Sequence, residues 1–180
     1  MNNKLQYLLG GAALMYSQGC QPTVVEAPRP APTPIVCEPS LDMIDFSATT
    51  LNEEEVGLED YVCDGSLIVL NFWETWCGPC RAEMPYLAQF ARDYERDVTV
   101  LGLTRDQNGD TTDYVANPEF EGINYLITTQ DTFSAYGITA IPTSFLLDEK
   151  GEMVMSHRGA MAFEETDDIV QVVDYLLGQE

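Results

Sequence analysis

The sequence contains few cations, one histidine and no apolar run of membrane-spanning length. Its 180 residues include 8 Lys and Arg against 30 Asp and Glu, which gives a net charge of −22. So acidic a chain repels other polyanions, which argues against nucleic acid and anionic membrane surfaces as direct partners. Because His157 is the only histidine, a zinc site would depend on cysteines, and Cys37 and Cys63 each lack a close cysteine neighbour. We expect neither a bound metal nor another cofactor.

Residues 1–19 are predicted to form a secretory signal peptide. They carry one cation, Lys4, followed by an apolar stretch from Leu5 to Tyr16 that is too short for a membrane span. The next residues, Ser17 to Cys20, resemble a bacterial lipoprotein processing site, in which the Cys20 sulfur would take the lipid. Plain cleavage and an uncleaved anchor are the alternatives. Each of the three would export the domain, so we expect an extracytoplasmic location.

Residues 20–36 are predicted to be a tether because they are rich in proline, with Pro22, Pro28, Pro30, Pro32 and Pro34. This composition favours extended polyproline structure over packing. At roughly 3.1 Å per residue, the segment would hold the domain up to about 50 Å from a membrane. The alternative is an N-terminal remnant without an anchoring role. The remaining residues, 37–180, have enough length for one domain with a sizeable core.

The patterns in residues 37–180 predict an α/β fold. The expected strands are Met43–Ser47, Ser66–Trp73, Val98–Thr104, Ile123–Thr128 as an edge or short strand, and a hairpin of Thr143–Leu147 with Glu152–His157. The expected helical segments are Cys77–Glu95, Thr112–Ala116, Thr132–Tyr136 and Phe163–Leu177, with an acidic connection and a helical turn over Thr49–Tyr61. The second and third strands, joined by the first helix, predict a parallel βαβ unit.

The strongest motif is the C-x-x-C sequence in residues 76–80, which follows an apolar strand and begins a helix. A helix N-terminus presents free backbone N–H groups and a positive dipole end. Both stabilise the thiolate form of Cys77, so we expect its pKa to lie below the free-thiol value of about 8.5. We expect Cys77, the more exposed sulfur, to be the nucleophile and Cys80, one turn deeper, to resolve the mixed disulfide. A permanent structural disulfide is the alternative, and zinc ribbons and metallochaperones share the C-x-x-C spacing.

Glu83 is the predicted partner of the dithiol in proton transfer. It lies three residues after Cys80 and six after Cys77, so on a helix it projects near the stripe that carries Cys80. A partly desolvated carboxylate at that position would exchange protons with the thiols. The alternative is an acid in the first turn that is favoured only by the helix dipole.

With the second motif, Ala140-Ile141-Pro142-Thr143, the chain resembles the thioredoxin family. The resemblance implies a central mixed β-sheet flanked by helices, here with an N-terminal extension. It also implies that Pro142 is a cis proline opposite the dithiol and that the Ile141 backbone pairs with an extended substrate segment. Without the resemblance, Pro142 would be read as an ordinary trans proline that begins an edge strand.

The longer run from Asn71 to Pro85 looks like the exported, membrane-tethered TlpA and ResA branch of that family. This likeness implies a thiol-disulfide oxidoreductase that reduces protein disulfides outside the cytoplasm, often in apocytochrome c, with electrons from a membrane donor. Asn71 stands where cytoplasmic thioredoxins carry a buried aspartate. Since Asn71 cannot act as a base, Glu83 is the better candidate for proton traffic.

The remaining site residues are expected around the dithiol and in the N-terminal segment. Trp76, with Gly78 and Pro79, is expected to shape the substrate groove, with a core tryptophan as the alternative. Trp73 is expected in the core, with the groove as its alternative. Export makes Cys37 and Cys63 a candidate structural disulfide. Closing a loop of about 27 residues would add roughly 3.5 kcal/mol on the chain-entropy model. A second redox pair is the alternative.

Two competing functions use the same dithiol. A peroxiredoxin-like thiol peroxidase places its cysteine in a Pro-x-x-x-Thr-x-x-Cys frame, which Cys77 lacks. A metal-binding chaperone would hold copper or zinc between Cys77 and Cys80, and it would be purified with stoichiometric metal under reducing conditions.

Overall fold

The computed structural model describes residues 38–41, 43–164 and 167–178. The predicted signal peptide, the lipidation site at Cys20, the proline-rich tether and Cys37 lie outside the described residues and stay predictions. Within the described ranges, no helix combines the length and apolar character that a membrane crossing requires.

In the described residues, seven strands form one mixed sheet in the order β2-β1-β5-β4-β3-β6-β7. The strands are β1 Ser47–Thr50, β2 Glu55–Gly57, β3 Leu67–Phe72, β4 Val98–Thr104, β5 Asn124–Thr128, β6 Thr143–Leu147 and β7 Met153–Arg158. The helices are α1 Gly78–Asp93, α2 Thr111–Val115, α3 Gln130–Ala135 and α4 Asp168–Leu177, with short 3-10 helices η1 Leu58–Asp60 and η2 Pro118–Phe120. The predicted α/β class with a central mixed sheet is confirmed.

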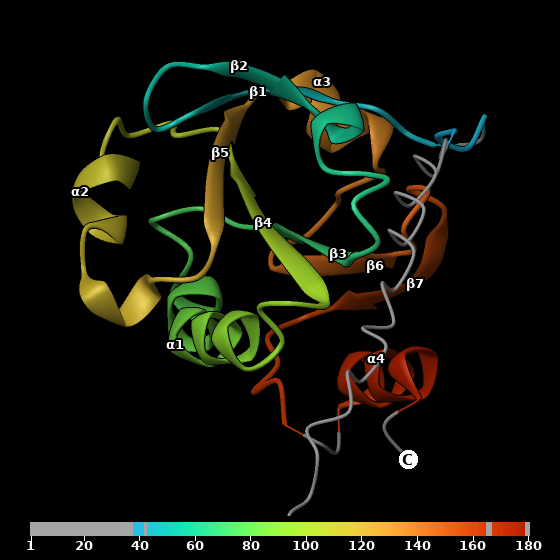
Figure 1. Ribbon diagram of the computed structural model, residues 1–180. Helices are drawn as coiled ribbons and strands as arrows, with labels where there is room; N and C mark the ends of the chain where they lie inside the picture. Colours follow the sequence, from blue (N-terminus) through green and yellow to red (C-terminus); the bar gives the residue numbers. More distant parts are fainter. Residues whose placement is uncertain (1–37, 42, 165–166, 179–180) are drawn as a thin grey trace, which may run out of the picture. The chain divides into compact units, whose positions relative to one another are not determined.

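Strand β3 runs through the centre of the sheet and is buried on both faces. Its side chains point alternately to the two faces of the sheet. Val69 packs in the hydrophobic cluster that contains residues of α1 and α4, whereas Ile68 and Leu70 pack in a second cluster that contains residues of α3 and η1. Figure 1 shows α1 and α4 on one face of the sheet and α3 on the other. A run that is apolar at every position but Asn71 therefore serves a two-faced core, as buried strands of α/β sheets do.

The predicted parallel βαβ unit is confirmed, because β3 and β4 pair in parallel with Leu67 opposite Val98. Strand β5 pairs in parallel with β4 on one side and antiparallel with β1 on the other. It therefore lies inside the sheet, so of the two predicted alternatives the edge strand was wrong, whereas the short strand is confirmed by a length of 5 residues. Only the antiparallel partner β1, which comes from a distant part of the chain, gives β5 its second neighbour.

The N-terminal hairpin differs from the prediction. The expected strand Met43–Ser47 begins only at Ser47, and the segment expected as an acidic connection contains strand β2, paired with β1. The predicted helical turn is present as η1. Strand β2 is three residues long and at the edge of the sheet, so its sequence needs only one apolar side chain, Val56, and gives a weak strand pattern.

The sheet topology brings three connections to one edge. Parallel strands β3 and β4 end there, and the antiparallel strand β6 begins there. The residues after β3, the residues after β4 and the residues before β6 consequently meet at that edge. In open α/β sheets, this carboxyl-end edge is where ligands bind.

Candidate active site

The two cysteines of the C-x-x-C motif are joined in a disulfide at the beginning of α1. Their Cα atoms lie 5.3 Å apart. Cys77 is the N-cap of the helix, and its sulfur accepts a hydrogen bond from the backbone N–H of Cys80 at 3.2 Å. Cys77 is 5% exposed and Cys80 is 0% exposed. An approaching sulfur therefore reaches Cys77 first, which is the order that the sequence predicts.

The loop before β6 faces the disulfide. The Ile141–Pro142 peptide bond is cis, as the resemblance implies, and the Cys77 sulfur lies 3.9 Å from the Ile141 carbonyl oxygen. Thr143 follows at once in β6, opposite Phe72 of β3. The sheet register thus fixes the distance between this loop and the N-terminus of α1.

Glu83 is buried one turn beyond Cys80. Its two carboxylate oxygens accept hydrogen bonds from the Asn71 side-chain amide at 2.8 Å and from the Met161 backbone N–H at 3.0 Å. Burial raises the pKa of Glu83 from 4.5 to about 7, while the two hydrogen bonds pull this pKa in the opposite direction. A carboxyl with a pKa near neutrality can both take and give a proton at physiological pH.

A groove of about 430 Å³ lies beside the disulfide. Its lining consists of Trp76, Arg105, Gln130, Phe133 and the residues 138–141. Trp76 is 54% exposed, so it is a groove residue and not a core tryptophan. Gly78 and Pro79 are exposed at the start of α1. Of the predicted substrate-binding residues, Trp76 and Ile141 thus line the groove, whereas Pro142 is buried behind it.

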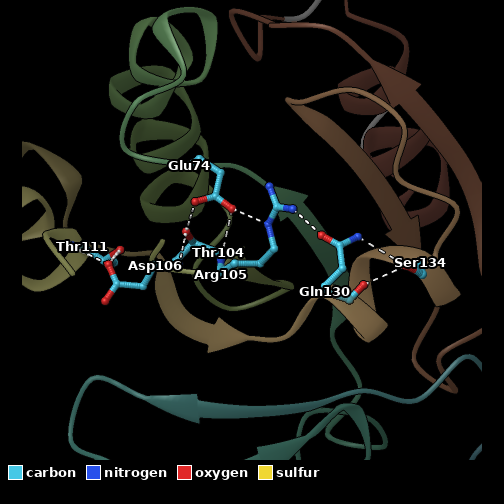
Figure 2. Close-up of polar contacts among 7 residues, drawn as sticks. All are labelled: Glu74, Thr104, Arg105, Asp106, Thr111, Gln130 and Ser134. Carbon is cyan, nitrogen blue, oxygen red and sulfur yellow. Dashed lines mark hydrogen bonds and ion pairs between the residues drawn. The ribbon is translucent and has the colours of Figure 1, made fainter. Parts of the chain in front are cut away.

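An ion pair at the groove was not predicted from the sequence. Glu74 is buried two residues after the end of β3, and its carboxylate accepts from Arg105 Nε at 2.7 Å and from Thr104 Oγ1 at 3.2 Å. The Arg105 guanidinium also donates to Gln130 and lies 4.4 Å from the centre of the Phe133 ring. Figure 2 shows the guanidinium held between Glu74 and Gln130.

Further hydrogen bonds hold the loop after β4. Asp106 accepts from the Thr111 backbone N–H at 2.9 Å and from the Thr111 hydroxyl at 2.5 Å, as Figure 2 also shows. The Thr75 hydroxyl donates to Asp110 at 2.6 Å. The connections after β3 and β4 are thus fastened to each other beside the dithiol.

The sequence contained an indication of the ion pair between Glu74 and Arg105, which we did not predict. Glu74 is a charged residue between two tryptophans at the end of an apolar strand, and Arg105 directly follows the next strand. Since neighbouring parallel strands end on the same side of a sheet, the two opposite charges could have been expected to lie close together. Ser144 and Met161, which surround Glu83 and Asn71, gave no comparable signal.

Of the second predicted cysteine pair, the structure describes only Cys63. Cys63 lies after η1, and its backbone N–H donates to the Glu149 carbonyl oxygen at 2.8 Å. Cys37 is outside the described residues, so the Cys37–Cys63 disulfide stays a prediction. In the described part of the chain, no three His, Cys, Asp or Glu side chains gather as metal ligands would.

A sheet with this topology, a disulfide at the start of α1 and a cis proline opposite define a thioredoxin-like redox protein. Comparisons agree with that class. Residues 40–156 match the model of the AhpC/TSA family. The chain belongs to this family and is a thiol-disulfide oxidoreductase.

Individual relatives are similar over most of their length. The thioredoxin-like protein YneN of Bacillus subtilis is 31% identical over 68% of this chain and 73% of its own. The thiol-disulfide oxidoreductase ResA of Geobacillus kaustophilus is 34% identical over 68% and 71%. Among solved structures, the exposed lipoprotein thioredoxin Etrx1 of Streptococcus pneumoniae superposes with a TM-score of 0.61 at 25% identity, over 73% of this chain and 98% of that one.

Proposed function

We propose that the protein reduces disulfides of protein substrates outside the cytoplasm, with Cys77 as nucleophile and Cys80 as resolving thiol. The observation that carries this proposal is the placement of the bonded pair. The Cys77 sulfur caps α1 and faces the Ile141 carbonyl, whereas Cys80 is fully buried behind it. This arrangement offers one sulfur to a substrate and keeps the other for the second step.

The exchange consumes one dithiol and one substrate disulfide. The Cys77 thiolate attacks a substrate sulfur, which forms a mixed disulfide and releases the other substrate sulfur as a thiolate that takes up a proton. Cys80 then loses its proton and attacks the Cys77 sulfur, which releases the second substrate thiol and closes the Cys77–Cys80 disulfide. Two electrons and two protons pass to the substrate, and an external dithiol of a membrane protein must restore them.

Glu83 supplies the proton acceptor for the second step. With a pKa of about 7, its carboxylate form takes the proton from Cys80 and its acid form returns a proton to the departing sulfur. Its placement one helical turn from Cys80, without a cation among its hydrogen-bond partners, favours such an exchange over a purely structural role.

The substrate segment lies across the loop before β6. Ile141 contributes backbone groups beside the cis proline, and Trp76 also lines the groove. Gly78 and Pro79 are exposed at the helix start, next to Cys77 in the sequence. An extended strand that pairs with Ile141 brings its disulfide within reach of Cys77. Backbone pairing of this kind binds many sequences, because it uses groups that all peptides share.

Three further features belong to the proposed function. The signal peptide of residues 1–19, lipidation of Cys20 and the tether of residues 20–36 would hold the domain outside the membrane. The relative from Streptococcus pneumoniae is named an exposed lipoprotein, which supports this location. Disulfides of apocytochrome c before haem attachment are the proposed substrates, by the likeness to the TlpA and ResA branch.

Trapping tests the reaction and its substrates together. A Cys80→Ser variant stops at the mixed disulfide, so substrates stay attached to Cys77 and are released by dithiothreitol. We expect apocytochrome c among the proteins captured from the envelope of the host cell. A Cys77→Ser variant is the matched control, and equal capture by both variants contradicts the assigned roles. A Cys20→Ser variant that stays in the membrane fraction contradicts lipidation.

The reduction potential of the Cys77–Cys80 pair tests the direction of electron flow. A strongly reducing value agrees with a reductase fed by a membrane donor, and a strongly oxidising value makes the protein a disulfide donor instead. Two controls address the alternatives. Hydrogen peroxide turnover that needs Cys77 alone would establish a peroxidase, and stoichiometric copper or zinc after reducing purification would establish a metal chaperone.

A further inference from the structure

Arg105 brings a positive charge to the groove beside the dithiol. Among the described residues that line the groove, it is the only charged one. The whole chain has just 8 Lys and Arg against 30 acidic residues. A cation at this place is therefore unusual for this chain, and the contacts of Arg105 decide whether it is structural or binds a substrate.

The Arg105 side chain is fixed before any substrate arrives. Its Nε donates to Glu74, its Nη1 donates to Gln130, and its guanidinium stacks on the Phe133 ring. These three contacts restrain a side chain that is otherwise costly to order. A guanidinium held in this way loses little freedom when it binds a further group.

One edge of the guanidinium is left for a ligand. Within the described residues, the Arg105 Nη2 group has no hydrogen-bond partner, and Figure 2 shows one terminal nitrogen without a dashed line. The side chain is 19% exposed, whereas that of Glu74 is 1% exposed. A ligand in the groove can consequently reach the N–H donors of Arg105 but little of the Glu74 carboxylate.

The hydrogen-bonding chemistry of a guanidinium indicates which ligand would bind at its free edge. Guanidinium N–H groups form their strongest hydrogen bonds with carboxylates, which match them in charge and in planar geometry. The net charge of −22 repels acidic proteins at long range, but a contact inside the groove acts at short range, where salt screens it less. Arg105 can therefore bind one acidic group of a substrate, while the surface of the protein as a whole still repels polyanions.

We propose that Arg105 is a specificity residue that binds a carboxylate of the substrate close to the disulfide that Cys77 attacks. The inference rests on the proposed reductase function, because it assigns the groove to the substrate segment. The carboxylate is either an Asp or Glu side chain or the C-terminus of the substrate chain. Both sources present the same planar anion to Arg105.

Single-turnover reduction of short peptides tests the proposal. Each peptide is amidated and carries one cysteine in a mixed disulfide with 2-mercaptoethanol, which is neutral. A glutamate is placed at each position from three before to three after the cysteine, and a matched series has glutamine at the same positions. A further glutamine peptide has a free C-terminal carboxylate. The second-order rate constant of the fully reduced protein is measured with each peptide at 0.15 M salt.

We expect the wild-type protein to reduce the best glutamate peptide about tenfold faster than its glutamine analogue, as one charge-assisted hydrogen bond in a partly exposed site allows. The Arg105→Gln variant loses this preference. Since that change leaves Glu74 buried without its cation, the double variant Glu74→Gln with Arg105→Gln is measured as well. The exposed Arg96→Gln variant removes one positive charge elsewhere and keeps the preference.

The outcomes separate the inference from the function on which it rests. If the wild-type protein reduces none of the peptides, the proposed function fails. If it reduces all of them at equal rates, or if the preference persists in the double variant, the role of Arg105 is overturned and the reductase function stands. A preference only for the free C-terminus supports the proposal and identifies the chain end as the carboxylate source.

Discussion

The side-chain amide of Asn71 donates a hydrogen bond to the carboxylate of Glu83 at 2.8 Å, and both side chains are buried in the core below the dithiol. The same amide nitrogen donates to Ser144, which is opposite Asn71 in the register of β3 and β6. Within the described residues, the side-chain oxygen Oδ1 of Asn71 has no hydrogen-bond partner. A hydrogen bond from a central strand thus holds the Glu83 carboxyl in its place on α1, one turn after Cys80.

Replacing Glu83 by glutamine should slow the resolving step. The amide cannot take the Cys80 proton, so we expect a loss of about 100-fold, in the usual range for a general base. The wild-type rate should rise with pH through a break near 7, the pKa of Glu83. Stopped-flow measurement of disulfide closure from pH 5 to 9 checks this. An E83Q profile with the same break would show that another group titrates.

The same carboxyl should make the protein less stable as the pH rises. The folded state keeps a proton on Glu83 up to a pKa of about 7, whereas the ordinary pKa is 4.5. Between these values the unfolded state binds fewer protons, so the free energy of unfolding falls by on the order of 3 kcal/mol and then levels off. Urea unfolding of the oxidised protein at several pH values measures the slope.

The slope, and not the absolute stability, is the readout for that prediction. In the E83Q variant the part of the slope that comes from Glu83 should vanish, although the glutamine amide, with a single oxygen, accepts only one of the two hydrogen bonds that Glu83 accepts from Asn71 and the Met161 N–H. Replacing exposed Glu95 by glutamine is the control and should leave the slope unchanged. A wild-type protein whose stability is constant from pH 4.5 to 7 contradicts the buried-acid description.

An Asn71→Asp variant should raise the pKa of Glu83 above its present value of about 7. The new carboxylate would lie where an amide now donates at 2.8 Å, and two acids so close share one proton. The break in the closure profile should move to higher pH. Asn117→Asp, a change at an exposed 3-10 helix cap, should not move it, and an unshifted break in N71D argues against direct coupling.

The two tryptophans should respond oppositely to substitution. Trp76 is exposed in the groove, so Trp76→Ala should lower kcat/KM for a peptide disulfide by about tenfold with little change in Tm. Trp73 is fully buried, so Trp73→Phe should cost about 1–3 kcal/mol of stability. Peptide kinetics and thermal unfolding of both variants check this. A large fall in Tm for W76A would return Trp76 to the core.

Gly102 of β4 should not tolerate a side chain. A Cβ atom there would lie 3.1 Å from Ile123, 3.2 Å from the Trp73 indole nitrogen and 3.2 Å from Tyr125. We expect Gly102→Ala to lower the free energy of unfolding by about 1–3 kcal/mol through overpacking. Gly78→Ala, whose Cβ would meet nothing within 4 Å, is the control for stability. Equal denaturation midpoints for the two variants would contradict the close packing.

Local patterns predicted the elements that bury two faces or begin at a strong signal. Strand β4 spans Val98–Thr104 as expected, because its alternating β-branched residues are legible in the sequence. Helix α4 begins at Asp168, later than the expected Phe163. Phe163 instead packs from a loop against the ring of Phe90, at 5.3 Å between centroids. Apolar spacing alone could not distinguish a helical residue from an anchored loop residue.

The sequence by itself determined the dithiol and the acid one turn later, since a strand and a helix start specify them locally, whereas the place of Pro142 opposite the dithiol followed from the family resemblance. Only the tertiary structure decided how deeply Glu83 is buried and which groups hold it, because Asn71 and Met161 come from distant segments. It also joined Glu74 to Arg105. Burial and pairing depend on contacts between remote residues, and these contacts exist only once the sheet has set its strand order.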